Sequence, residues 1–164
     1  MTTCVSLVAV ALMVATMLPS SAAQVTCHDP FILIGNYSCL HVPPEKKMNW
    51  VDARHFCQNL PQSRYTDLAI LDDCSQLSYI WNYLAYSLHM KVHYWIGGSD
   101  VGHEGIWRWV RNNDLVTMGV PFWYPGQPDG SNAENHLTIS NTGYLADGAD
   151  NELYNFICQA FPDE

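Results

Sequence analysis

The sequence predicts a single α+β domain, because two helical segments are followed by short strands and then by a long polar segment. Residues 49–60 and 75–88 carry apolar side chains at helical spacing, whereas residues 93–97 and 105–110 are short aromatic stretches bounded by turn residues. Residues 112–150 are rich in Gly, Asn, Asp and Pro, which predicts a long loop with a functional role. Residues 154–160 predict one closing strand.

Local signals define where the two helices begin. Asn49 is a favoured N-cap residue, and Pro61 ends the first segment. The second segment follows Asp72 and Asp73, whose negative charges favour a helix N-terminus. We therefore expect two short amphipathic helices.

An apolar, uncharged segment opens the chain. Residues 5–18 are almost wholly apolar, and Ser21 and Ala23 fit the −3 and −1 positions of a signal-peptidase site. A membrane anchor is the alternative, but the run of about 14 residues is shorter than the ~20 that span a bilayer. We therefore expect residues 1–23 to be a cleaved signal peptide, residues 24–164 to be the secreted domain, and no membrane span.

Composition and motifs exclude several classes of function. The 164 residues include 7 Lys and Arg against 16 Asp and Glu, for a net charge of −9. Such an acidic chain is unsuited to nucleic acid or to an acidic membrane surface. The sequence contains no G-x-S-x-G elbow, P-loop, HExxH motif or Rossmann fingerprint, so we expect no enzyme.

Cysteine usage fits a secreted domain. Five cysteines remain once Cys4 leaves with the signal, so at least one is free or pairs with another chain. No CxxC occurs, which argues against a structural zinc site. Asn36-Tyr37-Ser38 is an N-glycosylation sequon, and both a glycosylated and an unmodified Asn36 remain open.

The most distinctive stretch is Trp95-Ile96-Gly97-Gly98-Ser99-Asp100, followed by Glu104-Gly105-Ile106-Trp107-Arg108-Trp109. Core packing explains the tryptophans themselves, but the pattern resembles the WIGL and EGxWxW region of C-type lectin domains. Three further motifs resemble that family and stand in its order: Trp50…Ala53…Phe56-Cys57, Gln127-Pro128-Asp129 and Phe156-Ile157-Cys158-Gln159. The resemblance covers residues 27–159, and the chain is similar to the short single-domain lectins of invertebrates.

The resemblance implies the C-type lectin fold and two disulfides, Cys27–Cys39 and Cys57–Cys158. The second would close a loop of about 100 residues and contribute roughly 4–5 kcal/mol on the chain-entropy model. Cys74 is then left over. It is either a buried free thiol or the site of an intermolecular disulfide, which would make a homodimer and raise avidity.

The resemblance also implies a calcium site that binds sugar directly, with Gln127, Asp129, Glu134 and Asp147 as its residues. Ca²⁺ takes six to eight oxygen ligands, and a cis bond before Pro128 would turn the side chains on either side toward one point. A polar surface turn is the alternative. The QPD order resembles galactose-type members, which predicts galactose or N-acetylgalactosamine on glycans or microbial surfaces. Candidates to stack on that sugar are Trp123, Tyr124 and Tyr144.

Three departures from the family pattern keep a second hypothesis open. Ala146 stands where the family has a calcium-ligating Asn, and His136 and Asp150 occupy the register of its inner cysteine pair. Gly130 replaces an acidic or amide residue, which makes an auxiliary calcium site doubtful. One hypothesis is therefore a secreted calcium-dependent lectin, with pathogen recognition or agglutination as its role. The other is a lectin-like domain that binds a protein independently of calcium and sugar.

Overall fold

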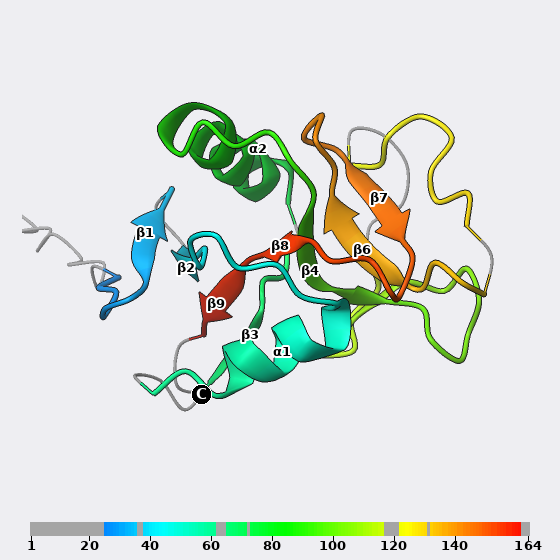
Figure 1. Ribbon diagram of the computed structural model, residues 1–164, viewed down its shortest axis with the longest axis horizontal. Helices are drawn as coiled ribbons and strands as arrows, with labels where there is room; N and C mark the ends of the chain where they lie inside the picture. The colour runs from blue at the N-terminus through cyan, green and yellow to red at the C-terminus, as the bar shows by residue number, and fades with distance from the viewer. Residues whose placement is uncertain are drawn as a thin grey trace, which may run out of the picture.

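The computed structural model describes residues 25–35, 38–61, 65–71, 73–116, 122–130 and 132–161, with Cys74 described by its backbone alone. These residues form helices and two β-sheets (Figure 1), which confirms the predicted α+β class and the C-type lectin fold. The expected signal segment and Asn36 lie outside the described residues. Within them, no helix is long and apolar enough to cross a membrane.

The first sheet brings the two ends of the domain together. Its strands are β1 (Ile32–Ile34), β2 (Ser38–His41), β9 (Cys158–Ala160) and β3 (Thr66–Leu68), in that spatial order. All neighbours are antiparallel, and β9 lies between β2 and β3. The C-terminal strand is therefore the one that joins the N-terminal hairpin to the rest of the fold.

The second sheet carries the long loop region. It has the order β5 (Arg108–Trp109), β4 (Tyr94–Ser99), β6 (His136–Ile139) and β7 (Leu145–Gly148). A short strand, β8 (Asn155–Phe156), pairs in parallel with β4. In the view of Figure 1, the β6–β7 hairpin and the loop before it lie on the far side of β4 from β2 and β9.

Helix α1 (Trp50–Gln58) begins where the sequence predicts. The Asp52 backbone N–H donates to Asn49 Oδ1 at 2.9 Å, which completes the expected N-cap. One face buries Trp50, Ala53 and Cys57. The Trp50 indole N–H also donates to the Ile96 carbonyl at 2.8 Å, so α1 is fixed against β4.

Helix α2 (Cys74–Asn82) is shorter than the predicted segment and continues as a π-helical turn, Tyr83–Ser87. Asp73 caps its start, since Asp73 Oδ1 accepts from the Ser75 and Gln76 backbone N–H groups at 2.6 and 2.9 Å. Asp73 therefore stabilises this helix N-terminus by its negative charge, as predicted, and also by direct capping hydrogen bonds.

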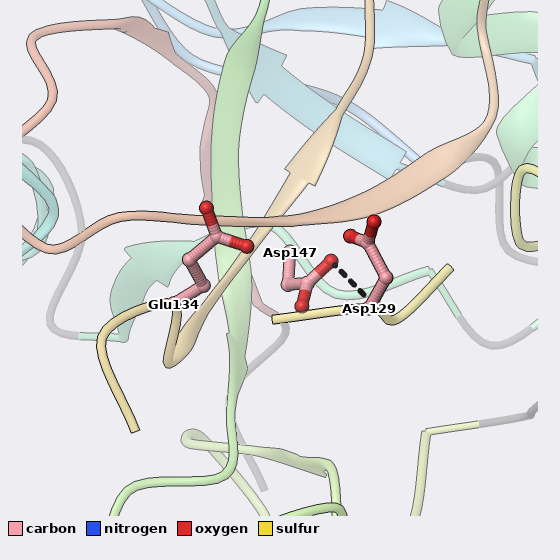
Figure 2. A group of neighbouring side chains, drawn as sticks. All are labelled: Asp129, Glu134 and Asp147. Atoms are coloured by element: carbon pink, nitrogen blue, oxygen red, sulfur yellow. Dashed lines mark hydrogen bonds between the residues drawn. The ribbon is translucent and has the colours of Figure 1, made fainter. Parts of the chain in front are cut away.

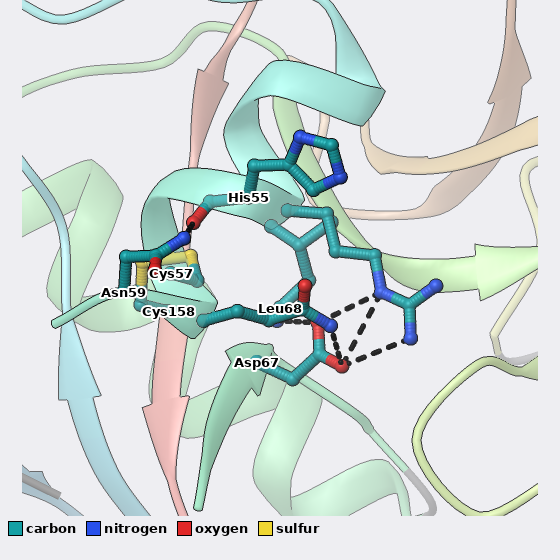
Figure 3. Close-up of a disulfide and its surroundings, with 8 residues drawn as sticks. His55, Cys57, Asn59, Asp67, Leu68 and Cys158 are labelled. Atoms are coloured by element: carbon teal, nitrogen blue, oxygen red, sulfur yellow. Dashed lines mark hydrogen bonds and ion pairs between the residues drawn. A yellow bond between two sulfur atoms is a disulfide. The ribbon is translucent and has the colours of Figure 1, made fainter. Parts of the chain in front are cut away.

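Disulfides join Cys27 to Cys39 and Cys57 to Cys158, the pairs that the resemblance implies. Beside the second one, the buried Asp67 carboxylate accepts from Arg54 Nε, Arg54 Nη2 and Gln58 Nε2, each at 3.1 Å (Figure 3). A buried carboxylate with this many donors is well compensated. The disulfide and the ion pair together fix α1 to β9 and β3.

The prediction of a continuous loop over residues 112–150 is wrong for the second half of that segment, because strands β6 and β7 lie within it. Strand β6 is buried along its whole length between β4 and β7, so its sequence does not alternate between polar and apolar residues. Its Thr138 hydroxyl donates to the Ala146 carbonyl at 3.0 Å and is thereby accommodated in the core. Strands β1, β2 and β3 were not expected from the sequence either.

Candidate functional site

The loop that carries the Gln127-Pro128-Asp129 tripeptide is fixed to β7 by backbone hydrogen bonds. Leu145 N–H donates to Phe122 O at 2.7 Å, and Tyr124 N–H donates to Leu145 O at 2.9 Å. The Gln127 N–H in turn donates to Tyr124 O at 2.9 Å. The Gln127–Pro128 peptide bond is cis. The tripeptide therefore has a defined position beside the strand that carries Asp147.

Three carboxylates from separate segments meet at this point. Asp129 lies on the loop, Glu134 precedes β6, and Asp147 is on β7 (Figure 2). One oxygen from each lies within 4.8 Å of the others. The Asp147 carboxylate is oriented by two backbone donors, Gly130 N–H at 2.7 Å and Asp129 N–H at 3.4 Å. These are three of the four residues expected at the calcium site.

The fourth expected residue, Gln127, lies beside the cluster with its amide already engaged. Its Nε2 donates to Asp129 Oδ1, and its Oε1 accepts from the Asp147 backbone N–H at 3.2 Å. The amide thus links the loop to β7 directly. In this arrangement Gln127 orients two of the acidic residues, and its oxygen is turned toward the backbone.

Gly130 has a role at the cluster that sequence patterns alone do not indicate. A Cβ on this residue would lie 2.5 Å from Glu134 Cβ and 2.6 Å from Glu134 Oε2, closer than real contacts allow. The missing side chain therefore gives the carboxylates their space, and the Gly130 N–H supplies the shortest hydrogen bond to Asp147.

Burial and mutual repulsion both act on these carboxyl groups. Burial raises the pKa of Glu134, and the negative charges of Asp147 and Asp129 raise it further. Burial also raises the pKa of Asp147, against the lowering effect of the backbone hydrogen bonds from Gly130 and Asp129. A cation between the three groups would relieve this repulsion. Clustered carboxylate oxygens of variable geometry are the donors that Ca²⁺ prefers, so the residues fit this ion.

His136 and Asp150 meet in space at the base of the same region. His136 Nε2 is 3.5 Å from Asp150 Oδ1, and the His136 side chain is 7% exposed. Burial lowers the pKa of His136, and the charges of Asp150 and Asp100 oppose that shift. The two positions that the family resemblance assigns to a disulfide thus carry a polar contact here.

Ala146 leaves the site one amide short of the family pattern. Its methyl side chain is 8% exposed in β7, next to Asp147. A methyl group offers no oxygen to a cation and no N–H to a hydroxyl. As expected from the sequence, Ala146 therefore contributes neither a cation ligand nor a hydrogen-bond donor to the site.

Two exposed tyrosines lie beside the tripeptide. Tyr124 and Tyr144 are 46% and 40% exposed, and their rings meet edge to face at 6.1 Å. Trp123, the third expected stacking residue, is 1% exposed and packs on Trp107. Tyr124 and Tyr144 are therefore the aromatic surface that a ligand at the cluster could contact.

This fold, with its two disulfides and its cluster of acidic residues in the long loop region, is that of a C-type lectin domain. Residues 46–160 match the family model described as "Lectin C-type domain". The chain belongs to this family. Membership supports carbohydrate binding in general and a non-enzymatic role.

Individual relatives match over part of their length. The chain is 34% identical over 98 residues to "Perlucin-like protein" from Mytilus galloprovincialis, which covers 60% of this chain and 58% of that protein. It is 33% identical over 103 residues to L-selectin from Mus musculus, covering 63% of this chain and 25% of that protein. Among solved structures, C-type lectin CEL-I from Cucumaria echinata superposes with a TM-score of 0.69 at 24% identity, over 81% of this chain and 96% of that one. The similarity to CEL-I is evidence for the fold alone.

Proposed function

We propose that this chain is a secreted, calcium-dependent lectin whose sugar site is formed by Asp129, Glu134 and Asp147, with Gln127 beside them. The observation that carries the proposal is the approach of three carboxylate oxygens within 4.8 Å of one another. Three acidic groups at this spacing, two of them partly buried, repel one another unless a cation or protons neutralise them. A bound calcium would supply that charge and leave coordination positions for neighbouring sugar hydroxyls.

The chain's own residues hold and orient the ligand in this proposal. Backbone N–H groups of Asp129 and Gly130 fix the Asp147 carboxylate, and Gln127 fixes Asp129. Carboxylate oxygens accept hydrogen bonds from sugar hydroxyls, while the Gln127 amide N–H can donate one. A site that offers both acceptors and a donor can distinguish sugars by the orientation of their hydroxyl groups.

The sugar that we propose for this site is of the galactose type. The Gln-Pro-Asp order places the amide before the acid, as in galactose-type members of the family. The exposed rings of Tyr124 and Tyr144 add a place for the apolar face of a hexose to stack. Recognition of galactose-bearing glycans on microbial surfaces, followed by agglutination, is the role that we propose for such a site.

The test uses the mature full chain with calcium or with EDTA. Calcium should raise the melting temperature and cause retention on galactose resin, and EDTA should abolish both effects. Asp129→Asn should lose both responses, because it removes one charge from an exposed ligand while keeping its size. Glu104→Gln, at an exposed carboxylate in another turn, is the matched control and should behave as wild type.

Secretion is tested on the same material. The mass of the protein recovered from the medium of a eukaryotic host should correspond to a chain that begins at Gln24. A decrease in mass after enzymatic removal of N-glycans would indicate that Asn36 is modified. Retention of residues 1–23 would contradict the signal-peptide hypothesis.

A protein ligand bound without calcium is the second candidate function. The observation that favours it is the engagement of both ends of the Gln127 amide, which link the loop to β7 through hydrogen bonds with Asp129 and the Asp147 backbone. The absence of an amide at Ala146 points the same way. If EDTA changes neither the melting temperature nor ligand retention, the calcium–sugar proposal fails and this candidate replaces it.

A further inference from the structure

A second pocket lies at the other end of the β6–β7 hairpin from the acidic cluster. Glu134 precedes β6, whereas Asn141 lies in the turn that joins β6 to β7. The pocket has a volume of about 280 Å³, the size of a small ligand. The polar and aromatic residues that line it are Lys47, Lys91, His93, Asn141, Tyr154 and Asn155.

The charged side chains that line this pocket are two lysines, Lys47 and Lys91. Lys47 and Lys91 are two of only seven Lys and Arg in a chain of net charge −9. Among the described residues, neither lysine forms an ion pair with a carboxylate. Lys91 Nζ lies over the Tyr86 ring at 5.3 Å from its centroid, a contact that leaves its positive charge uncompensated by a carboxylate. Two ammonium groups without a carboxylate partner at one cavity favour an anionic ligand.

Asn155 provides an independent sign of a missing ligand. It is 3% exposed, and its amide Nδ2 has no hydrogen-bond partner in the structure. The neighbouring Tyr94 hydroxyl donates to the Met90 carbonyl at 3.1 Å, and it lies near the Asn155 amide without meeting hydrogen-bond geometry. A buried amide N–H left unpaired costs free energy, which an acceptor in the pocket would recover.

The pocket wall is rigid and partly aromatic. Tyr154 and Met48 exchange backbone hydrogen bonds at 3.0 and 3.1 Å, and β8 pairs with β4 at Tyr94 and Asn155. The His93 ring stacks on Tyr154 with centroids 5.0 Å apart. An aromatic wall together with the Asn141 and Asn155 amides suits the ring and hydroxyls of a sugar.

We propose that this pocket binds a monosaccharide unit that carries an anionic group, a carboxylate or a sulfate, independently of calcium. The anion lies near Lys47 and Lys91, the ring lies along His93 and Tyr154, and an acceptor oxygen meets Asn155 Nδ2. The charge of Glu152 reaches His93 and opposes an anion on that side of the pocket. Because negative charge lies on the His93 side and positive charge lies at the two lysines, the anionic group is placed at the lysines.

The test is titration of the isotope-labelled full chain in EDTA, followed by NMR, with glucuronate, glucose 6-sulfate, glucose and inorganic sulfate as the probes. Both anionic sugars should shift the signals of residues at the pocket and bind about tenfold more tightly than glucose or inorganic sulfate. The stronger of the two identifies the preferred anion. Binding of inorganic sulfate as tight as that of the sugars would overturn the proposal, as would equal binding of glucose.

Variants separate this pocket from the calcium site. The double variant Lys47→Gln/Lys91→Gln should weaken binding of the anionic sugars about tenfold, while Glu152→Gln should strengthen it. Lys46→Gln is the matched control, because Lys46 does not line the pocket and, like Lys91, has its ammonium group over an aromatic ring. Asp129→Asn should leave this binding unchanged, so failure of the calcium proposal would not affect it. Unchanged binding in the double variant would overturn the proposal.

Discussion

The His136 imidazole lies parallel to the Trp50 indole, with ring centroids 4.1 Å apart and an interplanar angle of 2°. Through this stack the start of β6 rests on the first residue of α1. His136 Nε2 also contacts Asp150, which follows β7. One buried side chain therefore connects the region of the acidic cluster to the helix that the long-range disulfide anchors.

Replacing this contact with a disulfide should stabilise the loop. In His136→Cys/Asp150→Cys, a bridge would close a loop of about 15 residues and contribute about 3 kcal/mol on the chain-entropy model. The measurement is thermal unfolding with and without reductant, together with a thiol assay. Each single cysteine variant is the control. A double variant that keeps two free thiols in air would show that the two positions cannot be bridged.

A side chain at Gly130 should disturb the cluster. In Gly130→Ala, the added methyl would displace Glu134 or Asp147, so calcium affinity should fall by about tenfold or more. The measurement is a calcium titration followed by intrinsic fluorescence. The melting temperature in EDTA serves as the internal control for folding. Unchanged calcium affinity would mean that the carboxylates do not need this space.

An amide at position 146 should strengthen sugar binding. Ala146→Asn restores a donor and an oxygen beside Asp147, and one added hydrogen bond is worth roughly 0.5–1.5 kcal/mol. Affinity for galactose in calcium should therefore rise by roughly twofold to tenfold. Ala146→Leu, which has a similar size and no amide, is the control and should bind no better than wild type. Equal gains in both variants would assign the effect to packing.

Acid should destabilise the calcium-free protein in part through His41. Burial lowers the pKa of His41, and a hydrogen bond with the Pro30 backbone opposes this shift. A group of this kind binds fewer protons when folded, so its contribution to stability is complete above the unfolded pKa of about 6.5 and is lost as pH falls toward the folded pKa.

Urea unfolding in EDTA between about pH 7.5 and about pH 5.5 tests this effect. The free energy of unfolding of His41→Gln should depend less on pH than that of wild type, since glutamine does not titrate. The raised pKa values of Glu134 and Asp147 act with the opposite sign in both proteins, so they cancel in the comparison. An identical pH dependence in the two proteins would contradict the assignment to His41.

Cys74 should link two chains if it is the leftover cysteine of a secreted homodimer. Its backbone begins α2, and both disulfides in the described part of the chain use other cysteines. Non-reducing electrophoresis of the protein from an oxidising host should show a dimer that is absent in Cys74→Ser. Agglutination should fall together with the dimer, because linked sites bind with higher avidity. A wild-type monomer would leave Cys74 as a free thiol.

Local signals predicted α1 well because its start depends on one side chain. Asn49 caps the helix with its own amide oxygen, and the apolar positions follow the helical repeat. Strand β6 could not be predicted in the same way, since its environment comes from two neighbouring strands distant in sequence. Its residues are buried on both faces, so no alternation indicates a strand.

Some features of the candidate site could likewise be predicted from the sequence, whereas others depend on the fold. The tripeptide and its acidic partners were accessible from motif order, and three of them meet in the structure. The direction of the Gln127 amide and the space beneath Gly130 depend on where β7 lies, which no local pattern encodes. The contact between His136 and Asp150 likewise required the fold, although the family register had indicated the two positions.

The adjacency of β2 and β9 determines how force would pass through this domain. Cys39 pairs with Ala160, so the chain enters β2 and leaves β9 at the same end of one antiparallel ladder. Tension between the two ends of the domain would load the Cys27–Cys39 bridge, that ladder and the Cys57–Cys158 bridge first. Strand β7, which carries Asp147 of the acidic cluster, lies on the far side of β4 from this ladder (Figure 1). A pull on the two ends of this domain would therefore leave the acidic cluster mechanically unloaded.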